Sequence, residues 1–203
     1  MVGSLPIIEI DFKTLVQQEV EQEVNVQPRT NIAKAYKSVL LINPPYSMET
    51  GKDRKETYEY AIIPPIGMLT IAGELEKNDY KVSFIDAELE FLSDKQLIDK
   101  ILELKPDVVG IYCITANFKR IVELSKELKE KLNSLIFFGG PHVWHNWFET
   151  INTEAVDFAV IGEAEKTCVE VLDKLNSGQS LKDIKGIAYK ENGEIIFTGT
   201  RPF

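Results

Sequence analysis

The sequence contains little cysteine and little histidine, with two of each among 203 residues. Two cysteines exclude a disulfide framework and a cysteine-rich metal site, and both Cys113 and Cys168 lie in apolar segments, which favours a reduced, cytoplasmic setting. No run approaches the roughly 20 apolar residues of a membrane span, and the first residues lack the basic and apolar regions of a secretory signal. We therefore expect no membrane partner and no metal held by side chains.

Positive charge is also scarce. The 23 Lys and Arg residues face 32 Asp and Glu residues, which gives a net charge of −9 and a pI near 4.9. Such an acidic chain lacks the electrostatic attraction to phosphate backbones that nucleic-acid binding needs, so we expect no nucleic acid as a partner. Hydrophobic residues make up 44% of the chain, which is enough for a folded core.

Short apolar strands alternate with amphipathic helices from residue 37 onward. The expected strands are 38–42, 82–85, 107–112, 135–138 and 156–161. The expected helices are 65–78, 94–104, 116–132, a short one within 146–152, and 163–176. Strands that are apolar throughout, each followed by a helix, predict a parallel sheet with helices on both faces. The expected fold class is therefore α/β, doubly wound, with a five-stranded parallel sheet.

The two ends of the chain depart from this alternation. An Asn-Gly pair at 192–193 stands between two further apolar segments, 186–189 and 195–198, and this pattern predicts a C-terminal β-hairpin. Residues 1–36 form an N-terminal extension, in which 11–24 has the periodicity of an amphipathic helix. This helix either packs on its own domain or forms a contact with a dimer mate or another partner.

Ligands of open parallel sheets bind beyond the carboxyl ends of the strands, so the residues that follow each strand are the informative ones. Small, polar and turn-forming residues gather there: Asn43-Pro44-Pro45-Tyr46, Asp86-Ala87-Glu88, Cys113-Ile114-Thr115, Gly139-Gly140-Pro141-His142 and Gly162-Glu163-Ala164-Glu165. The sequence has no phosphate-binding P-loop, no three-glycine dinucleotide fingerprint, no receiver-type aspartates and no flavin-binding Ser/Thr/Gly loop. An enzyme that uses another nucleotide cofactor is therefore disfavoured.

The pair Gly139-Gly140 is the most informative of these segments. Two glycines at a strand end allow positive φ, and they leave space for a large flat ligand against the backbone; a tight turn is the alternative. Thr115 either caps the helix that follows it or donates its hydroxyl to the same ligand. Glu163 and Glu165 either stabilise a helix N-terminus or shape the rim of the site.

His142 and its neighbours form a second group. As a lone histidine at the rim, His142 is expected to be a hydrogen-bonding loop residue rather than a metal ligand. Trp144, His145 and Trp147 form an aromatic cluster beside it, which is either a packed loop, a lid over a ligand or a partner contact. Cys113 is expected to be a small buried hydrophobic residue.

Five motifs occur in order along residues 37–203: Val-Leu-Leu-Ile-Asn-Pro-Pro at 39–45, Pro-Pro-Ile-Gly-Met-Leu at 64–69, Gly-Gly-Pro-His at 139–142, Val-Ile-Gly-Glu-Ala-Glu at 160–165, and Arg201-Pro202. This succession resembles the N-terminal cobalamin-binding domain of the B12-dependent radical SAM enzymes. The resemblance implies a flavodoxin-like strand order, with the nucleotide tail of cobalamin running into the sheet. It covers 37–203 and leaves 1–36 outside the cobalamin-binding domain.

The resemblance also implies which residues surround the cofactor. They are Asn43, Pro44, Pro45, Tyr46 and Pro65 under the corrin, Thr115, Ala116, Gly139 and Gly140 along the tail, and Pro141, His142, Gly162, Glu163 and Glu165 around the nucleotide loop. Older cobalamin proteins carry a cobalt-binding histidine in the loop after the first strand, whereas the loop here begins Asn-Pro-Pro-Tyr-Ser. The implied state of cobalamin is therefore base-off and His-off.

Two features depart from the family pattern. The radical SAM signature Cys-x-x-x-Cys-x-x-Cys is absent, and two cysteines do not hold a 4Fe-4S cluster of that type. The usual Gly-Glu-Gly-Glu is Gly-Glu-Ala-Glu at 162–165. The expected function is to hold cobalamin for a radical SAM methyltransferase or cyclase, whose own domain or subunit binds the cluster and S-adenosylmethionine; alone, the chain is not expected to be catalytic. The alternative is a cofactor-free doubly wound module for protein interactions.

Overall fold

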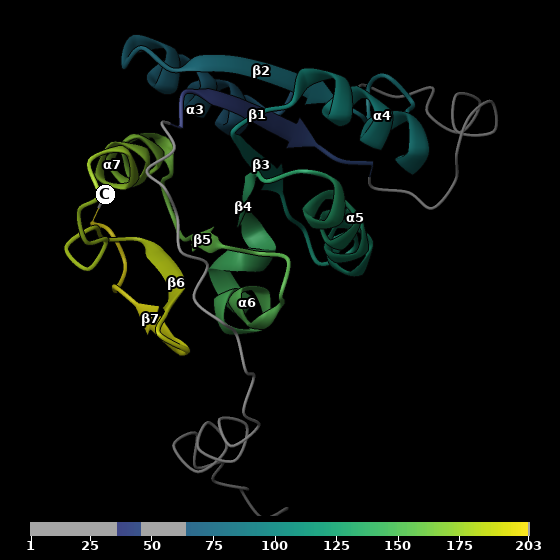
Figure 1. The fold of residues 1–203 in the computed structure, drawn as a ribbon. Helices are drawn as coiled ribbons and strands as arrows, with labels where there is room; N and C mark the ends of the chain where they lie inside the picture. Colours follow the sequence, from purple (N-terminus) through teal and green to yellow (C-terminus); the bar gives the residue numbers. More distant parts are fainter. Residues whose placement is uncertain (1–35, 46–63, 203) are drawn as a thin grey trace, which may run out of the picture. The chain divides into compact units, whose positions relative to one another are not determined.

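The computed structural model describes residues 36–45 and 64–202, and the predicted helix at 11–24 and the site residue Tyr46 lie outside this part. Strands and helices alternate as expected (Figure 1). The strands are β1 (Ser38–Asn43), β2 (Lys81–Asp86), β3 (Val108–Tyr112), β4 (Leu135–Gly139), β5 (Phe158–Val160), β6 (Ile187–Glu191) and β7 (Glu194–Phe197). The helices are α3 (Ile66–Lys77), α4 (Asp94–Leu104), α5 (Phe118–Lys131), α6 (Pro141–Asn152) and α7 (Glu165–Asn176).

All the strands belong to one sheet, in the order β2-β1-β3-β4-β5-β6-β7. Strands β1 to β5 are parallel, so the α/β doubly wound class and the flavodoxin-like order are confirmed. The strand number is a correction, because the sheet formed by the described residues has seven strands rather than five. The hairpin does not stand apart: β6 pairs antiparallel with β5, with Ala188 opposite Ala159.

Two physical reasons explain why the hairpin joins the sheet. The turn residues Asn192 and Gly193 have φ values of 53° and 84°, which suits a tight turn and returns the chain antiparallel. The last parallel strand, β5, would otherwise expose unpaired backbone groups along its edge. Pairing satisfies them and buries Ile187 and Ala188.

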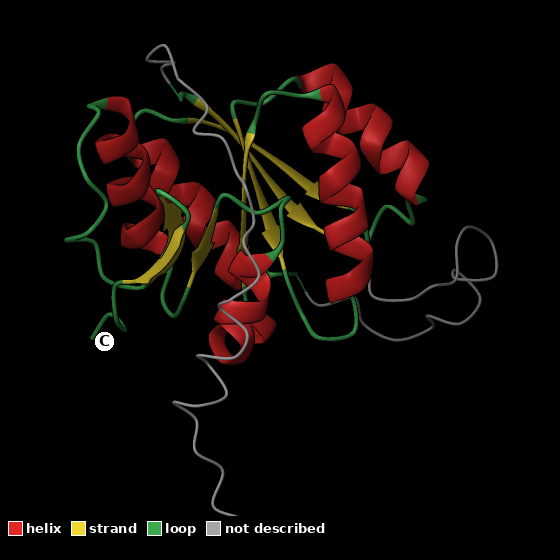
Figure 2. Cartoon of the chain, turned by 60° about the horizontal axis from the view of Figure 1, so that its bottom comes forward, coloured by secondary structure: helices red, strands yellow, loops and turns green. Residues whose placement is uncertain are grey.

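Helices cover both faces of the sheet, with α3 and α7 on one face and α4, α5 and α6 on the other (Figures 1 and 2). Because successive strand residues point to opposite faces, Leu40 enters the core under α4 and α5, and Leu41 enters the core under α3 and α7. This double burial explains why the strands are apolar throughout. In the part of the chain that the structure describes, no helix has the length and apolar character needed to cross a bilayer.

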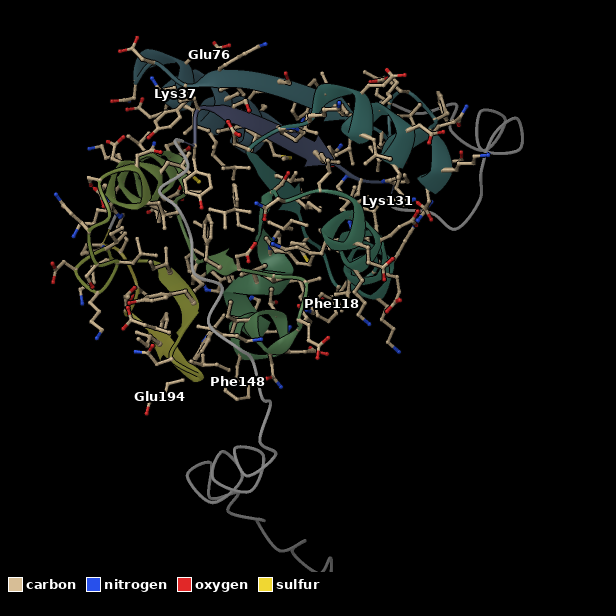
Figure 3. The ribbon with its side chains drawn as sticks, in the orientation of Figure 1. Lys37, Glu76, Phe118, Lys131, Phe148 and Glu194 are labelled. Atoms are coloured by element: carbon tan, nitrogen blue, oxygen red, sulfur yellow. The ribbon has the colours of Figure 1, made fainter. Side chains whose placement is uncertain are left out.

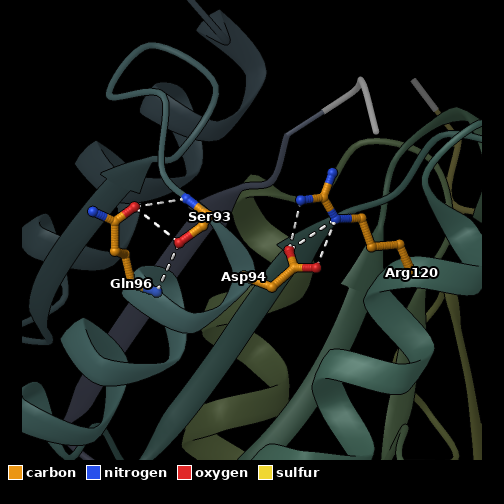
Figure 4. Close-up of polar contacts among 4 residues, drawn as sticks. All are labelled: Ser93, Asp94, Gln96 and Arg120. Atoms are coloured by element: carbon orange, nitrogen blue, oxygen red, sulfur yellow. Dashed lines mark hydrogen bonds and ion pairs between the residues drawn. The ribbon is translucent and has the colours of Figure 1, made fainter. Parts of the chain in front are cut away.

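Helix α4 begins where the sequence predicts. The Ser93 hydroxyl accepts a hydrogen bond from the amide of Gln96, and the Gln96 side chain accepts one from the amide of Ser93 (Figure 4). This capping box satisfies two backbone donors at the helix N-terminus. At the next residue, Asp94 pairs with Arg120 through two atoms of the guanidinium, Nε and Nη2, which ties α4 to α5 (Figure 4).

Three other helix starts are corrections. Helix α5 begins at Phe118 rather than 116, and α7 begins at Glu165 rather than 163. Helix α6 begins at Pro141 rather than near 146, and it bends at Asn146, whose φ is −126° and ψ is 39°. Proline is favourable in the first helical turn, because the amide it lacks has no intrahelical acceptor there. Pro141 therefore starts α6 directly after Gly140 instead of prolonging the loop.

The amino ends of the strands are held by carboxylates that bind backbone amides. Asp107 accepts hydrogen bonds from the amide and hydroxyl of Ser38 at 3.0 and 2.8 Å. Asp157 accepts one from the amide of Ile136 at 2.6 Å. The polar side chains at the amino ends of the strands are thus engaged in internal hydrogen bonds. The candidate ligand-binding residues lie at the opposite rim, at the carboxyl ends of the strands.

Candidate functional site

The candidate site is the rim formed by the carboxyl ends of the five parallel strands. The strand register places Asn43 beside Asp86 and Tyr112 beside Gly139. The predicted residues of 43–45, 115–116, 139–142 and 162–165 all follow these strand ends, so the fold brings them to one edge of the sheet. In doubly wound sheets this edge is where ligands bind.

Gly140 makes the turn between β4 and α6. Its φ of 110° and ψ of −174° lie in a region that is almost restricted to glycine. A Cβ at this position would stand 2.8 Å from the carbonyl oxygen of Cys113 and 2.9 Å from the ring of Tyr112. The space beside Gly140 is thus filled by β3, and the expected turn accounts for this glycine.

Gly139 lies in more open surroundings than Gly140. A Cβ there would meet only the carbonyl oxygen of Val160, at an ordinary 3.8 Å, among the described residues. Gly139 pairs with Tyr112 and follows Phe137 by two residues, so it faces the layer of α3 and α7. The missing side chain therefore leaves room at the strand end on this face.

Glu165 links the two helices that border this room. Its carboxylate accepts a hydrogen bond of 2.8 Å from the hydroxyl of Thr70, so α7 is joined to α3. Glu163 precedes the helix, is exposed, and accepts the hydroxyl of Thr167 through its backbone carbonyl at 3.1 Å. Of the two predicted acidic residues, Glu165 therefore shapes the space between the helices, while the Glu163 carboxylate faces solvent.

Trp144 crosses the rim from α6. Gly162 has a φ of 88°, and a Cβ on it would lie 3.5 Å from the Trp144 indole. The indole therefore covers Gly162 at the end of β5, yet 43% of Trp144 stays exposed. The two tryptophans of the predicted aromatic cluster do not pack together at the rim. Trp147 instead stacks on Phe197 of β7, with ring centroids 4.6 Å apart. Of the predicted cluster, Trp144 is the tryptophan that lies against a predicted site residue, Gly162.

His142 lies in the first turn of α6 and not in a rim loop, which corrects the expected placement. Only 4% of the residue is exposed, and its ring stacks on Phe118 with centroids 4.2 Å apart. Phe118 lies at the start of α5, on the side that faces α6 (Figure 3). The Nδ1 atom of His142 is 3.2 Å from Oγ1 of Thr115. Burial lowers the pKa of His142, and the nearby Glu149 carboxylate opposes this shift, so the imidazole is neutral near pH 7.

Thr115 and Ala116 are exposed at the end of β3. Thr115 does not cap α5: Asn117 occupies the N-cap position, and its Oδ1 atom accepts the amide of Ile114 at 3.0 Å. The Thr115 hydroxyl is instead held by His142 at the rim. Within the described residues, Nδ2 of Asn117 is buried and has no hydrogen-bond partner. Asn117 was not predicted from the sequence, and its side chain makes no capping hydrogen bond to α5 but binds the amide of Ile114 instead.

The end of β1 is fixed against β2. The side-chain amide of Asn43 donates a buried hydrogen bond of 2.9 Å to Oδ1 of Asp86, which also accepts the amide of Leu89 at 3.0 Å. Asn43, Pro44 and Pro45 are buried, so this part of the predicted loop packs against the domain. Sequence reasoning placed Asp86 at a strand end but did not pair it with Asn43, because that pairing depends on the register.

Pro65 occupies the N-cap position of α3, and its carbonyl accepts the amides of Met68 and Leu69. Ile66 and Leu69 remain 67% and 43% exposed at this end of the helix. The first turn of α3 therefore presents exposed apolar side chains, and the contact of the Pro65 region with the corrin stays a prediction.

The thiols and carboxylates of the described residues do not form a metal centre. No group of three or more His, Cys, Asp or Glu side chains is arranged to hold an ion there. Burial raises the pKa of both thiols, Cys113 and Cys168, to about 12, with Glu149 and Glu165 respectively adding to the shift. Both thiols are therefore protonated and unreactive near neutral pH.

A family model described as the B12 binding domain matches residues 59–172. The chain belongs to the B12-binding domain family. The recognition of a cobalamin-binding domain and the assignment of cobalamin as the family's cofactor are thereby confirmed. The expected boundaries, 1–36 and 37–203, are finer than this match and stay predictions.

The chain is similar to parts of longer proteins that are named as enzymes. The chain is 28% identical over 168 residues to an anaerobic magnesium-protoporphyrin IX monomethyl ester cyclase of Synechocystis, with 81% of this chain and 33% of that enzyme covered. It is 32% identical over 143 residues to an uncharacterized methyltransferase of Pyrococcus horikoshii, with 68% and 30% covered. The chain thus spans about a third of the length of these relatives.

Solved structures share the fold. The cobalamin-dependent S-adenosylmethionine radical enzyme OxsB with aqua-cobalamin and S-adenosylmethionine bound matches with a TM-score of 0.66 at 19% identity, covering 82% of this chain and 22% of that one. The radical S-adenosylmethionine methyltransferase TsrM from Kitasatospora setae, with cobalamin and a [4Fe-4S] cluster bound, matches with a TM-score of 0.65 at 16% identity, covering 81% and 29%. At these identities the likeness concerns the fold alone.

Proposed function

We propose that this domain binds cobalamin across the rim and presents it to a radical SAM methyltransferase or cyclase domain or subunit. The observation that carries the proposal is the open position of Gly139, where a Cβ would meet no described atom closer than 3.8 Å, at a rim that also carries the exposed residue Thr115. When bound, cobalamin supplies a cobalt centre that carries a methyl group or assists radical chemistry. The residues of this chain bind and orient it.

In this proposal the rim residues have separate roles. Gly139 admits the dimethylbenzimidazole tail, and Thr115 with Ala116 borders it. Pro44, Pro45 and Pro65 lie under the corrin, with Asn43 held by Asp86, and the predicted contact of Tyr46 falls outside the described residues. Gly140, Pro141 and His142 fix the turn behind the tail, and Gly162, Glu163 and Glu165 shape the nucleotide end of the site.

We propose that cobalamin is bound base-off and His-off. The only histidines of the chain are His142 and His145, and neither follows β1. His142 is enclosed by Phe118 and Thr115 and is 4% exposed, which keeps its nitrogens from a cobalt ion in the corrin. A tail that occupies the space beside Gly139 cannot also coordinate the cobalt on the lower face of the ring.

The chemistry of the complete system belongs to the proposal as well. The relatives named methyltransferase or cyclase are about three times as long as the matched region, and a radical SAM domain or subunit would supply the 4Fe-4S cluster and S-adenosylmethionine. The chain has two cysteines, both buried, so it does not hold such a cluster. A dimer through 11–24 stays a prediction, since that segment lies outside the described residues.

The experiment compares cobalamin with cobinamide, which has the same corrin but lacks the nucleotide tail. Both tryptophans of the chain lie on α6, and Trp144 lies at the rim, so corrin binding should quench intrinsic fluorescence. We expect saturable quenching by hydroxocobalamin and binding of cobinamide that is weaker by at least about tenfold. Equal affinities would contradict the tail space beside Gly139. Folded protein that binds neither compound would favour the cofactor-free interaction module.

A further inference from the structure

Thr115 and His142 form a pair in which a buried ring supports an exposed hydroxyl. Thr115 is exposed at the end of β3, whereas His142 is 4% exposed in the first turn of α6. The contact joins Nδ1 of His142 to Oγ1 of Thr115 at 3.2 Å. A surface threonine ordinarily rotates its hydroxyl among several partners, but here one direction is occupied by the ring nitrogen.

The ring itself has little freedom. It stacks on Phe118 at 4.2 Å with an interplanar angle of 26°. The backbone amide of His142 donates to the carbonyl of Cys113 at 3.1 Å, which ties the first turn of α6 to the end of β3. The two elements that carry His142 and Thr115 are thus held together by backbone as well as side-chain contacts, and the geometry of the pair is fixed before any ligand arrives.

The surroundings of Nε2 decide which ring nitrogen carries the proton. Nε2 is buried without a hydrogen-bond partner among the described residues, and the nearest charged atom is Oε2 of Glu149 at 3.8 Å. A lone pair that faced this carboxylate would be repelled, whereas an N–H group would be attracted. Phe118 of α5, which stacks on the ring, is uncharged and offers no competing charge.

We infer that His142 is a positioning residue with its proton on Nε2, and that it makes the Thr115 hydroxyl a fixed hydrogen-bond acceptor at the rim. With the proton on Nε2, Nδ1 accepts the hydroxyl proton of Thr115, and the free lone pairs of Oγ1 face the site. A ligand group that donates an N–H, such as an amide of the corrin periphery or of the tail linker, is the matching partner. This inference rests on the proposed cobalamin function.

The first experiment measures the tautomer without cofactor. The ¹⁵N chemical shifts of the His142 ring, recorded near pH 7.5, should show a protonated Nε2 and an unprotonated Nδ1. The variant Glu149→Gln removes the charge that favours this tautomer, so the Nδ1–H form should gain population. A proton on Nδ1 in the unmodified protein would overturn the inference, and so would a tautomer ratio that Glu149→Gln leaves unchanged.

The second experiment is a double-mutant cycle on hydroxocobalamin affinity. Thr115→Val and His142→Phe, which keeps a ring on Phe118, should each weaken binding about five- to tenfold, the effect of one hydrogen bond. The double variant should be no weaker than either single one, because the two residues act as a unit. Thr115→Ser should keep the affinity, and His145→Phe, three residues along α6, is the matched control.

Several outcomes would overturn the inference. His142→Phe that binds as well as the unmodified protein, or effects of the two single variants that add, would show that the residues act independently. If His142→Phe does not fold, Thr115→Val and Thr115→Ser at the exposed position still decide whether the hydroxyl is used. Unmodified protein that binds no cobalamin would instead refute the proposed function, while the ring shifts would still report on the pair.

Discussion

The carbonyl oxygen of Cys113 stands 2.8 Å from the point where Gly140 would carry a Cβ, whereas the same point on Gly139 is 3.8 Å from its nearest neighbour, the carbonyl of Val160. The adjacent residues Gly139 and Gly140 therefore have different structural roles. Gly140 allows β4 to turn into α6 against β3, and Gly139 leaves a space at the strand end. Substitution at the two positions separates folding from binding.

Gly140→Ala should destabilise the fold by about 2–5 kcal/mol, because it adds a clash to a backbone conformation that alanine disfavours. Gly139→Ala should change the free energy of unfolding by less than about 1 kcal/mol, since its Cβ meets no close neighbour. Chemical denaturation of both variants beside the unmodified protein measures the difference. Similar losses at both positions would contradict the distinct environments of the two glycines.

Gly139→Leu tests the space itself. A leucine side chain would extend into the space assigned to the cofactor tail, so cobalamin affinity should fall at least about tenfold, while the absence of close neighbours around the Cβ among the described residues lets the protein stay folded. Cobinamide affinity should change little, because that compound has no tail. Fluorescence titration with both compounds, with Gly139→Ala as the small-side-chain control, gives the comparison. Retained cobalamin affinity in Gly139→Leu would place the tail elsewhere.

Ser93 and Asp94 stabilise the start of α4 by different means (Figure 4). Ser93→Ala removes the capping box and should cost about 1 kcal/mol. Asp94→Asn removes the pair with Arg120 and should cost about 0.5 kcal/mol, because the Asp94 side chain is 49% exposed. Denaturation in low and high salt distinguishes the two effects, since only the ion pair is screened. A Ser93→Ala effect that shrinks with salt, or an Asp94→Asn effect that does not, would contradict this assignment.

Burial lowers the pKa of His142, so acid should destabilise the domain through this residue. Below the ordinary histidine pKa of about 6.5, the unfolded chain binds a proton that the folded ring resists, and stability is lost as pH falls. Glu149, 3.8 Å from Nε2, reduces this effect without removing it. The stability advantage of the unmodified protein over His142→Gln should therefore narrow between about pH 7.5 and 5.5. An advantage that grows in acid would mean that the folded pKa is raised.

The sequence predicts most of the fold because its local signals agree. Continuous apolar runs reveal strands that are covered on both faces, as at β1. The predicted start of a helix at residue 94 is confirmed, and Ser93 caps α4 there. The predicted helix starts are wrong where one local pattern is compatible with two structures. Pro141 after two glycines is typical of a loop, but proline also suits the first turn of a helix, and only the contact with Cys113 decides.

The site is less predictable than the fold, because its contacts depend on register and on chain crossings. The motifs identify the rim and the residues 139–142, but nothing local distinguishes the packed Gly140 from the open Gly139. The same holds for His142, which lies 27 residues from Thr115 in sequence and reaches it only through the pairing of β3 with β4. Asp86 was missed as the partner of Asn43 for this reason, whereas the contact of Asn117 with Ile114 spans only three residues and does not depend on register.

The most direct test of the central claim is the visible spectrum of the protein after incubation with hydroxocobalamin and removal of free cofactor by desalting. The account predicts one retained cobalamin per chain, with the spectrum of the base-off form and no imidazole ligand on cobalt. A histidine-ligated spectrum would contradict the enclosed position of His142, and a base-on spectrum would contradict the tail beside Gly139. Folded protein that retains no cobalamin would contradict the proposed function as a whole.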